Sequence, residues 1–134
     1  MTLYINIVQD IKPLILEAIE GLTEDKVAGD FISEDVNCVA ILDSIGSNRN
    51  LETFGSTVFR PKFGILVRNE TKEGARVWID KIIKALHQKS HYIVDGKDYI
   101  MISLVGFVNY NAKDELGLRY ALCEFSTMIS EEES

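Results

Sequence analysis

Two histidines have the spacing of a metal site. His87 and His91 are four residues apart, which on one continuous helix would place both imidazoles on the same face, where they could bind zinc. No glutamate accompanies them in a His-Glu-x-x-His arrangement, and they fall at the end of a helical pattern and just beyond it. We therefore interpret both as solvated side chains at a helix end and predict no metal ligand.

The other reactive residue types do not form a recognisable catalytic set. The acidic pairs Glu34-Asp35 and Asp114-Glu115 lie in segments typical of turns, where carboxylates favour solvent. Cys38 and Cys123 each lie in an apolar stretch without a Cys-x-x-Cys or Cys/His cluster, so we interpret them as core residues. Phosphate-binding glycine loops and a Gly-x-Ser-x-Gly elbow are also missing. The residues thus predict no catalytic group and no cofactor; an enzyme with a main-chain or substrate-assisted site is the remaining alternative.

Bulk properties narrow the class of protein. The 134 residues suit one domain, and 46% hydrophobic with 26% charged residues is typical of a soluble globular chain. The formal charge of −7 offers no basis for general binding to DNA or to an anionic membrane. Neither a signal peptide nor an apolar run of roughly 18 residues is visible, so we expect folding in a reducing cytoplasm and no membrane partner.

The elements that must position these residues are organised around residues 56–86, where a strand, a turn and a helix follow one another. A period of two with one apolar side predicts a half-buried strand. One side of it carries Thr57, Phe59, Pro61, Phe63, Ile65 and Val67, and the other carries Val58, Arg60, Lys62, Gly64, Leu66 and Arg68. Thr71 can cap the amphipathic helix that follows, and the apolar stripe of this helix can cover the apolar side of the strand.

A second helix is predicted within residues 3–22, closed by Gly21 and Thr23. Pro13 leaves two alternatives: the helix begins near Asp10, with Pro13 in its first turn, or a longer helix kinks at Pro13.

The remaining pattern predicts strands. We expect a short strand in residues 26–32, a better one in residues 36–42, a hairpin with an Asp95-Gly96 turn, and a last strand in residues 118–129. Residues 99–108 are apolar on both sides, which predicts a central strand covered on both faces for part of its length, with a bulge at Gly106. The fold class is α+β: a mainly antiparallel sheet with two helices packed on one face. Residues 1–129 form the single domain, and residues 130–134 form an acidic, flexible tail.

Two features suit contacts with other chains. The polar stretch of residues 43–55 is longer than compact domains usually carry without a use, although a floppy hairpin connection is the alternative. Arg60, Lys62 and Arg68 share one side of the first strand, and they form either a basic contact patch or an ordinary solvated face.

Four ordered pieces resemble the tail terminator and tail-completion proteins of tailed phages, often labelled minor capsid or tail-to-head joining proteins. They are residues 39–44 (Val-Ala-Ile-Leu-Asp-Ser), residues 61–69 (Pro-Lys-Phe-Gly-Ile-Leu-Val-Arg-Asn), the helix with Ala75 and Leu86, and residues 114–125, which begin Asp-Glu-Leu-Gly-Leu-Arg. In the last piece Leu118 separates Gly117 from Arg119, a departure of one residue from the family's Asp-Glu-x-Gly-Arg turn. Ser44-Ile45-Gly46 stands where the family usually has Gly-Gly. The resemblance spans residues 36–129.

The resemblance implies a structural virion protein of the tail or neck, assembled in the host cytoplasm, that performs no catalysis. Such proteins close into a ring, typically a homohexamer, on the last ring of the tail tube. They stop tube polymerisation and dock the head-completion protein, while DNA passes through the lumen without specific binding. The interaction residues we then expect are Arg60, Lys62, Arg68, Asp43, Asn48, Arg49, Asn50, Asp114, Glu115 and Arg119. A small α+β regulatory or protein-binding domain without a virion role is the alternative from a different class.

Overall fold

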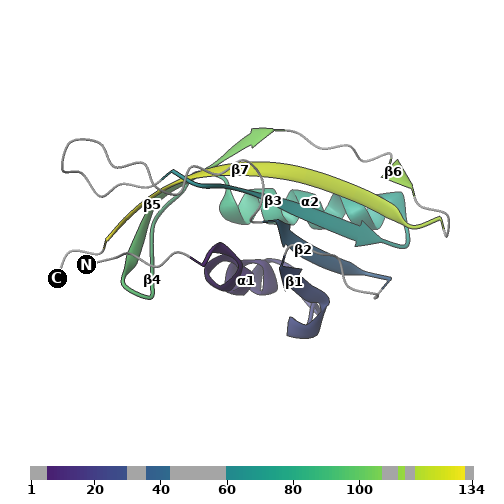
Figure 1. Cartoon of the computed structure of the whole chain (residues 1–134). Coiled ribbons are helices and arrows are strands. Elements are labelled where there is room, and N and C mark those ends of the chain that lie inside the picture. The colour runs from purple at the N-terminus through teal and green to yellow at the C-terminus, as the bar shows by residue number, and fades with distance from the viewer. Residues whose placement is uncertain (1–5, 30–35, 43–59, 107–111, 114–116, 132–134) are drawn as a thin grey trace.

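A computed structural model describes residues 6–29, 36–42, 60–106, 112–113 and 117–131 (Figure 1). Two α-helices, a short 3-10 helix and one sheet make up this part of the chain. In chain order they are α1 (Ile7–Ala18), η1 (Glu24–Lys26), β1 (Val27–Gly29), β2 (Cys38–Leu42), β3 (Lys62–Asn69), α2 (Lys72–Leu86), β4 (Lys89–Val94), β5 (Lys97–Gly106), β6 (Ala112–Lys113) and β7 (Arg119–Glu131).

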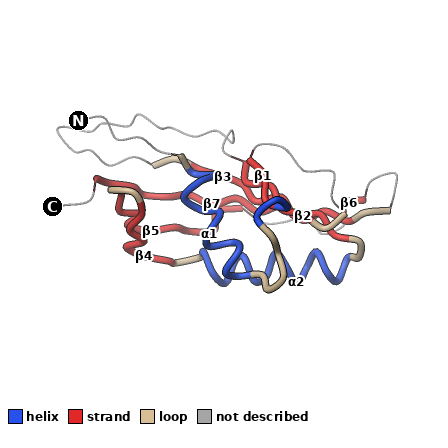
Figure 2. Tube along the Cα trace, turned by 90° about the horizontal axis from the view of Figure 1, so that it is seen from below, coloured by secondary structure: helices blue, strands red, loops and turns tan. Residues whose placement is uncertain are grey.

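The sheet has the order β1-β2-β3-β7-β5-β4, and the two-residue β6 also pairs with β7. Every pairing is antiparallel except β1 with β2, which is parallel. Figure 1 shows the long β7 arching over the helices, and Figure 2 shows the helices as neighbours, with the β4–β5 hairpin at one end of the molecule. This arrangement confirms the predicted α+β fold.

The core lies between the helices and one face of the sheet. Phe63, Ile65 and Val67 of β3 are fully buried, which confirms the predicted apolar side of this strand. Phe63 stacks on Phe125 of β7 with ring centroids 5.3 Å apart. From α2, the residues at helical spacing that enter this core are Ala75, Ile79, Ile82 and Leu86. We call the opposite face of the sheet, which carries Lys62 and Leu122, the outer face.

Both helices begin at side-chain caps. Thr71 Oγ1 accepts from Gly74 N at 2.9 Å, as predicted for α2. Asn6 Oδ1 accepts from Gln9 N at 3.1 Å and starts α1 at Ile7, so Pro13 lies inside the helix and not in its first turn. The start near Asp10 is therefore wrong and the helix is the longer one, while a kink at Pro13 stays a prediction. Pro13 is tolerated because it is exposed, so the Gln9 carbonyl that loses its N–H donor lies on the solvent side.

The β4–β5 hairpin turns as predicted, with positive φ at Asp95 (50°) and Gly96 (73°). The expected bulge at Gly106 is also present, as a register shift between Leu104 and Gly106. The cover on both faces that was predicted for part of residues 99–108 is not found in the described part of this strand, because Met101 is 38% and Val105 52% exposed. Both helices lie on the other face, so no described element covers the outer face of β5.

Several predicted boundaries shift. The strand predicted at residues 26–32 is described only as Val27–Gly29, and β2 begins at Cys38. β7 continues through Glu131, so Ser130 and Glu131 pair with β5 and are not frayed as expected. Residues 57–59 and 132–134 lie outside the described residues. Neither described helix combines the length and the apolar character that a membrane span requires.

Candidate interaction surface

Arg60 and Lys62 lie at the start of β3 and are both exposed. Lys62 stands on the outer face, opposite Ser126 of β7. Between them Pro61 is buried, and its carbonyl accepts from Thr127 N at 3.0 Å and from Thr127 Oγ1 at 2.8 Å. Neither cation forms an ion pair within the described residues. The two charges therefore extend from a firmly held backbone and are available to a partner.

Arg68, predicted to lie in solvent on the same side of the strand, is 8% exposed. It pairs across the sheet with Cys38, which is fully buried, and with Tyr120, which is half-buried. The expectation that the Arg68 side chain is exposed is therefore wrong. Six residues separate Arg68 from Lys62, which is about 20 Å along a strand. The structure does not bring the three basic residues into one patch.

Of the other predicted interaction residues, the structure describes Arg119. It is half-buried at the start of β7, opposite Asn69 of β3 and Lys113 of β6. The remaining predicted residues lie outside the described residues: Asp43, Asn48, Arg49, Asn50, Asp114 and Glu115.

A buried ionic network joins α1 to the β4–β5 hairpin and was missed at the level of sequence. Lys97 Nζ lies 2.7 Å from Asp10 Oδ2, and both side chains are 1% exposed. Tyr99 OH donates to the same carboxylate oxygen at 2.5 Å, and Tyr92 OH donates to the Asp10 carbonyl at 2.8 Å. The available signal was the position of Asp10 within the apolar stripe of α1, directly before the buried Ile11.

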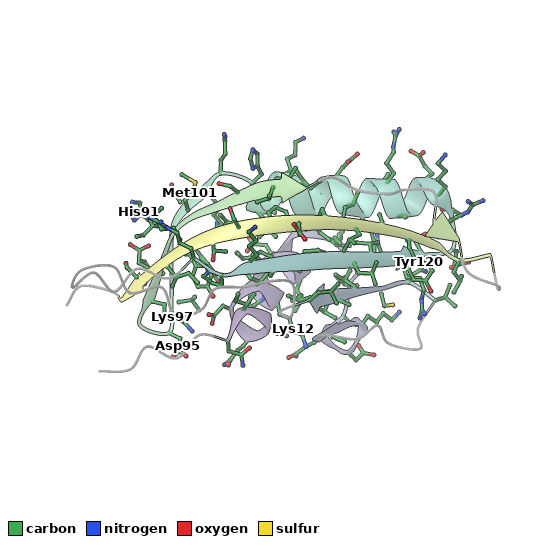
Figure 3. The ribbon with its side chains drawn as sticks, turned by 45° about the horizontal axis from the view of Figure 1, so that its top comes forward. Lys12, His91, Asp95, Lys97, Met101 and Tyr120 are labelled. Atoms are coloured by element: carbon green, nitrogen blue, oxygen red, sulfur yellow. The ribbon has the colours of Figure 1, made fainter. Side chains whose placement is uncertain are left out.

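A groove of about 730 Å³ lies beside this network, between α1 and the β4–β5 turn. It is lined by Asn6, Val8, Gln9, Asp10, Lys12, Pro13, Leu16, Glu24, Val94 and Asp95. Figure 3 shows Asp95 and Lys97 at the end of the hairpin, with Lys12 on the neighbouring α1. Lys12 Nζ lies 3.8 Å from Glu24 Oε1, while Asp95 forms no ion pair within the described residues. The groove thus combines an apolar lining with carboxylates at its rim.

The outer face also carries exposed apolar side chains. Ile93 of β4, Met101 and Val105 of β5 and Leu122 of β7 are between 38% and 52% exposed. Scattered apolar residues are normal on a protein surface, but these four lie on three neighbouring strands of one face.

The histidines serve local structure. His87 Nδ1 accepts from Leu104 N at 3.0 Å and so connects the end of α2 to β5. His91, with φ of 51°, places Nδ1 3.0 Å from Asp98 Oδ2. Among the described residues no group of three or more His, Cys, Asp or Glu side chains could hold a metal ion.

Both cysteines are buried, at 0% for Cys38 and 1% for Cys123, which confirms the prediction that they are core residues. Burial raises the pKa of the Cys123 thiol to about 12. At neutral pH this thiol is therefore a poor nucleophile.

Comparison with known proteins finds both a family model and solved structures that are similar to this chain. The family model described as "Bacteriophage tail terminator protein" matches residues 15–126. A solved structure titled "Virion of native gene transfer agent (GTA) particle" contains a chain with a similar fold, at a TM-score of 0.61 and 9% sequence identity. The match covers 92% of this chain and 97% of that one. No curated protein sequence matches.

Proposed function

This chain belongs to the bacteriophage tail terminator family, whose members are structural proteins of the virion, and on that basis we propose that it closes into a ring on the end of the tail tube. The ring, a homohexamer, stops tube polymerisation and presents a docking surface to the head-completion protein. The chain is made in the host cytoplasm and becomes part of the tail or neck. DNA passes through the lumen, and the net charge of −7 disfavours a grip on its phosphates.

The observation that carries this proposal is the family match over residues 15–126, which spans the end of α1, all of α2 and most of the sheet. The structural similarity to a chain of a gene transfer agent virion supports the fold of such a protein. The surface is compatible with self-assembly, because the groove with carboxylates at its rim and two cations, Arg60 and Lys62, that form no ion pair with any described residue occupy different parts of one molecule. Different, complementary surfaces are what a heterologous ring contact needs.

Assembly with tail tubes tests the proposal. Purified protein is mixed with tubes polymerised from the matching tube protein, and negative-stain electron microscopy measures tube length and the density at tube ends. Native mass spectrometry gives the stoichiometry with and without tubes. We expect capped ends, arrested growth and a six-subunit species on the tubes. Continued tube growth at saturating protein, with no added density at the ends, would refute the proposal.

A further inference from the structure

We infer that the groove between α1 and the β4–β5 turn binds residues 60–62 of a neighbouring copy of this chain, so that Arg60 and Lys62 meet the carboxylates of Asp95 and Glu24. This inference rests on the proposed ring and assigns the two surfaces that form its subunit contact.

The groove has a negative rim. The buried Asp10–Lys97 pair as a whole adds no net charge to the rim. Asp95 is exposed and without an ion pair in the described residues, and the side chain of Glu24 is 81% exposed. Lys12 is the cation of the lining, and Glu24 lies 3.8 Å from it. Asp95 is therefore left as the uncompensated charge of the lining.

The surroundings of the groove extend this negative potential. Glu17 is exposed on α1, Glu20 is exposed in the turn after it, and Asp25 is exposed beside Glu24. The pKa of Tyr92, a residue joined to α1 by its hydroxyl, is raised by burial and further by the charges of Asp10 and Glu17. The groove and its margins thus suit a cationic partner with some apolar surface.

Arg60 and Lys62 supply that chemistry. They flank the buried Pro61, whose carbonyl is held by two hydrogen bonds from Thr127, so the cations extend from an ordered backbone. The cations on the exposed face of α2 differ, because carboxylates alternate with them. Arg76, for instance, lies 3.6 Å from Glu73. Arg60 and Lys62, which form no ion pair within the described residues, are the better complement to the groove.

The two surfaces cannot meet within one molecule. Lys62 stands on the outer face of the sheet, whereas the groove lies beside α1, which packs on the opposite face. Their contact is therefore between copies, and it joins two different surfaces. Repetition of such a heterologous contact generates a ring when the rotation closes. Because the charges are at an exposed rim, assembly through them weakens with added salt.

Charge exchange tests the contact. One variant combines Asp95→Asn with Glu24→Lys; the asparagine keeps a residue that tolerates positive φ before Gly96, so the turn is preserved. A second variant combines Arg60→Glu with Lys62→Glu, and a third carries all four changes. The matched control is Lys81→Glu with Lys84→Glu, two exposed cations on α2. Each is assayed for the ring species at 50 mM salt, with circular dichroism to verify folding.

We expect each two-residue variant to lower the ring fraction at least tenfold, the four-residue variant to return to within threefold of the unchanged protein, and the control to assemble normally. Normal assembly of both groove and strand variants, or no recovery in the combined variant, overturns this inference while the ring proposal stands. Absence of rings and of tube capping in the unchanged protein refutes the proposed function, and this contact with it.

A cross-link provides a readout that does not depend on charge. Because both native cysteines are buried, a Glu24→Cys, Lys62→Cys variant can be joined selectively by a short bis-maleimide. Ladders of covalently linked copies on assembled tubes support the contact. A Val77→Cys variant provides the exposed control site. The inference is overturned if rings of the Glu24→Cys, Lys62→Cys variant assemble fully but give purely monomeric product.

Discussion

Replacing Lys97 by methionine removes the cation from a buried ion pair and leaves the Asp10 carboxylate in the interior. Both side chains are 1% exposed, and water cannot replace the lost charge without opening the contact between α1 and the β4–β5 hairpin. Breaking a buried pair in this way costs about 3–5 kcal/mol. That is a large part of the roughly 5–15 kcal/mol by which folded domains are stable. For a chain of this length the melting temperature should fall by roughly 10–20 °C.

Urea unfolding at pH 7, followed by circular dichroism, measures this loss, and a double-mutant cycle separates the pair from its surroundings. The double variant Asp10→Leu, Lys97→Met replaces both charges by apolar groups and should recover most of the stability. The matched control is Lys12→Met, which removes the half-buried member of the ion pair with the exposed Glu24 and should cost less than about 1 kcal/mol. If Lys97→Met costs no more than Lys12→Met, or the double variant is no better than the single one, the network does not hold α1 to the hairpin.

Three further changes have defined outcomes. The Cys123 thiol has a pKa of about 12 in the folded protein, against an ordinary 9.0. The stability that this shift contributes is complete below pH 9 and is lost as the pH rises toward 12, at about 1.4 kcal/mol per pH unit. Urea titrations of Cys123→Ala should therefore show a free energy of unfolding that falls less steeply at alkaline pH than in the unchanged protein. An equally steep decline in that variant would assign the effect elsewhere, for example to Tyr92, whose pKa is also raised. Gly74→Ala should destabilise the fold, although alanine has the better helix propensity. The added Cβ would stand 2.1 Å from Asn69 Oδ1, which accepts a hydrogen bond from Thr71 N. A rise in melting temperature would contradict this. Thr71→Ala, which removes the cap of α2, should cost about 1 kcal/mol in the same assay, and an unchanged midpoint would show that the cap contributes nothing.

The sequence pattern was sufficient to predict an element where the residues of that element alone determine its backbone geometry. The alternation in β3, the helical stripe after Thr71 and the Asp95-Gly96 turn were each predictable, because backbone geometry sets a period of 2, a period of 3.6 or a positive φ. The α+β class followed from the order of these elements, and the resemblance to tail terminators followed from short ordered pieces that the family match then confirmed. The role of the predicted interaction residues stays a prediction.

Position in the sheet was decided only by tertiary structure. Arg68 is only 8% exposed at its place between Cys38 of β2 and Tyr120 of β7, although its side of the strand alternates as a solvated face does, and Met101 is exposed because no described element covers the outer face of β5. The Asp10–Lys97 pair joins residues 87 positions apart in sequence, and periodicity contains no information about such a contact. The 3.6-residue repeat could place Asp10 on the inner side of α1, but only the packing of that helix against the hairpin could supply the cation that makes its burial tolerable.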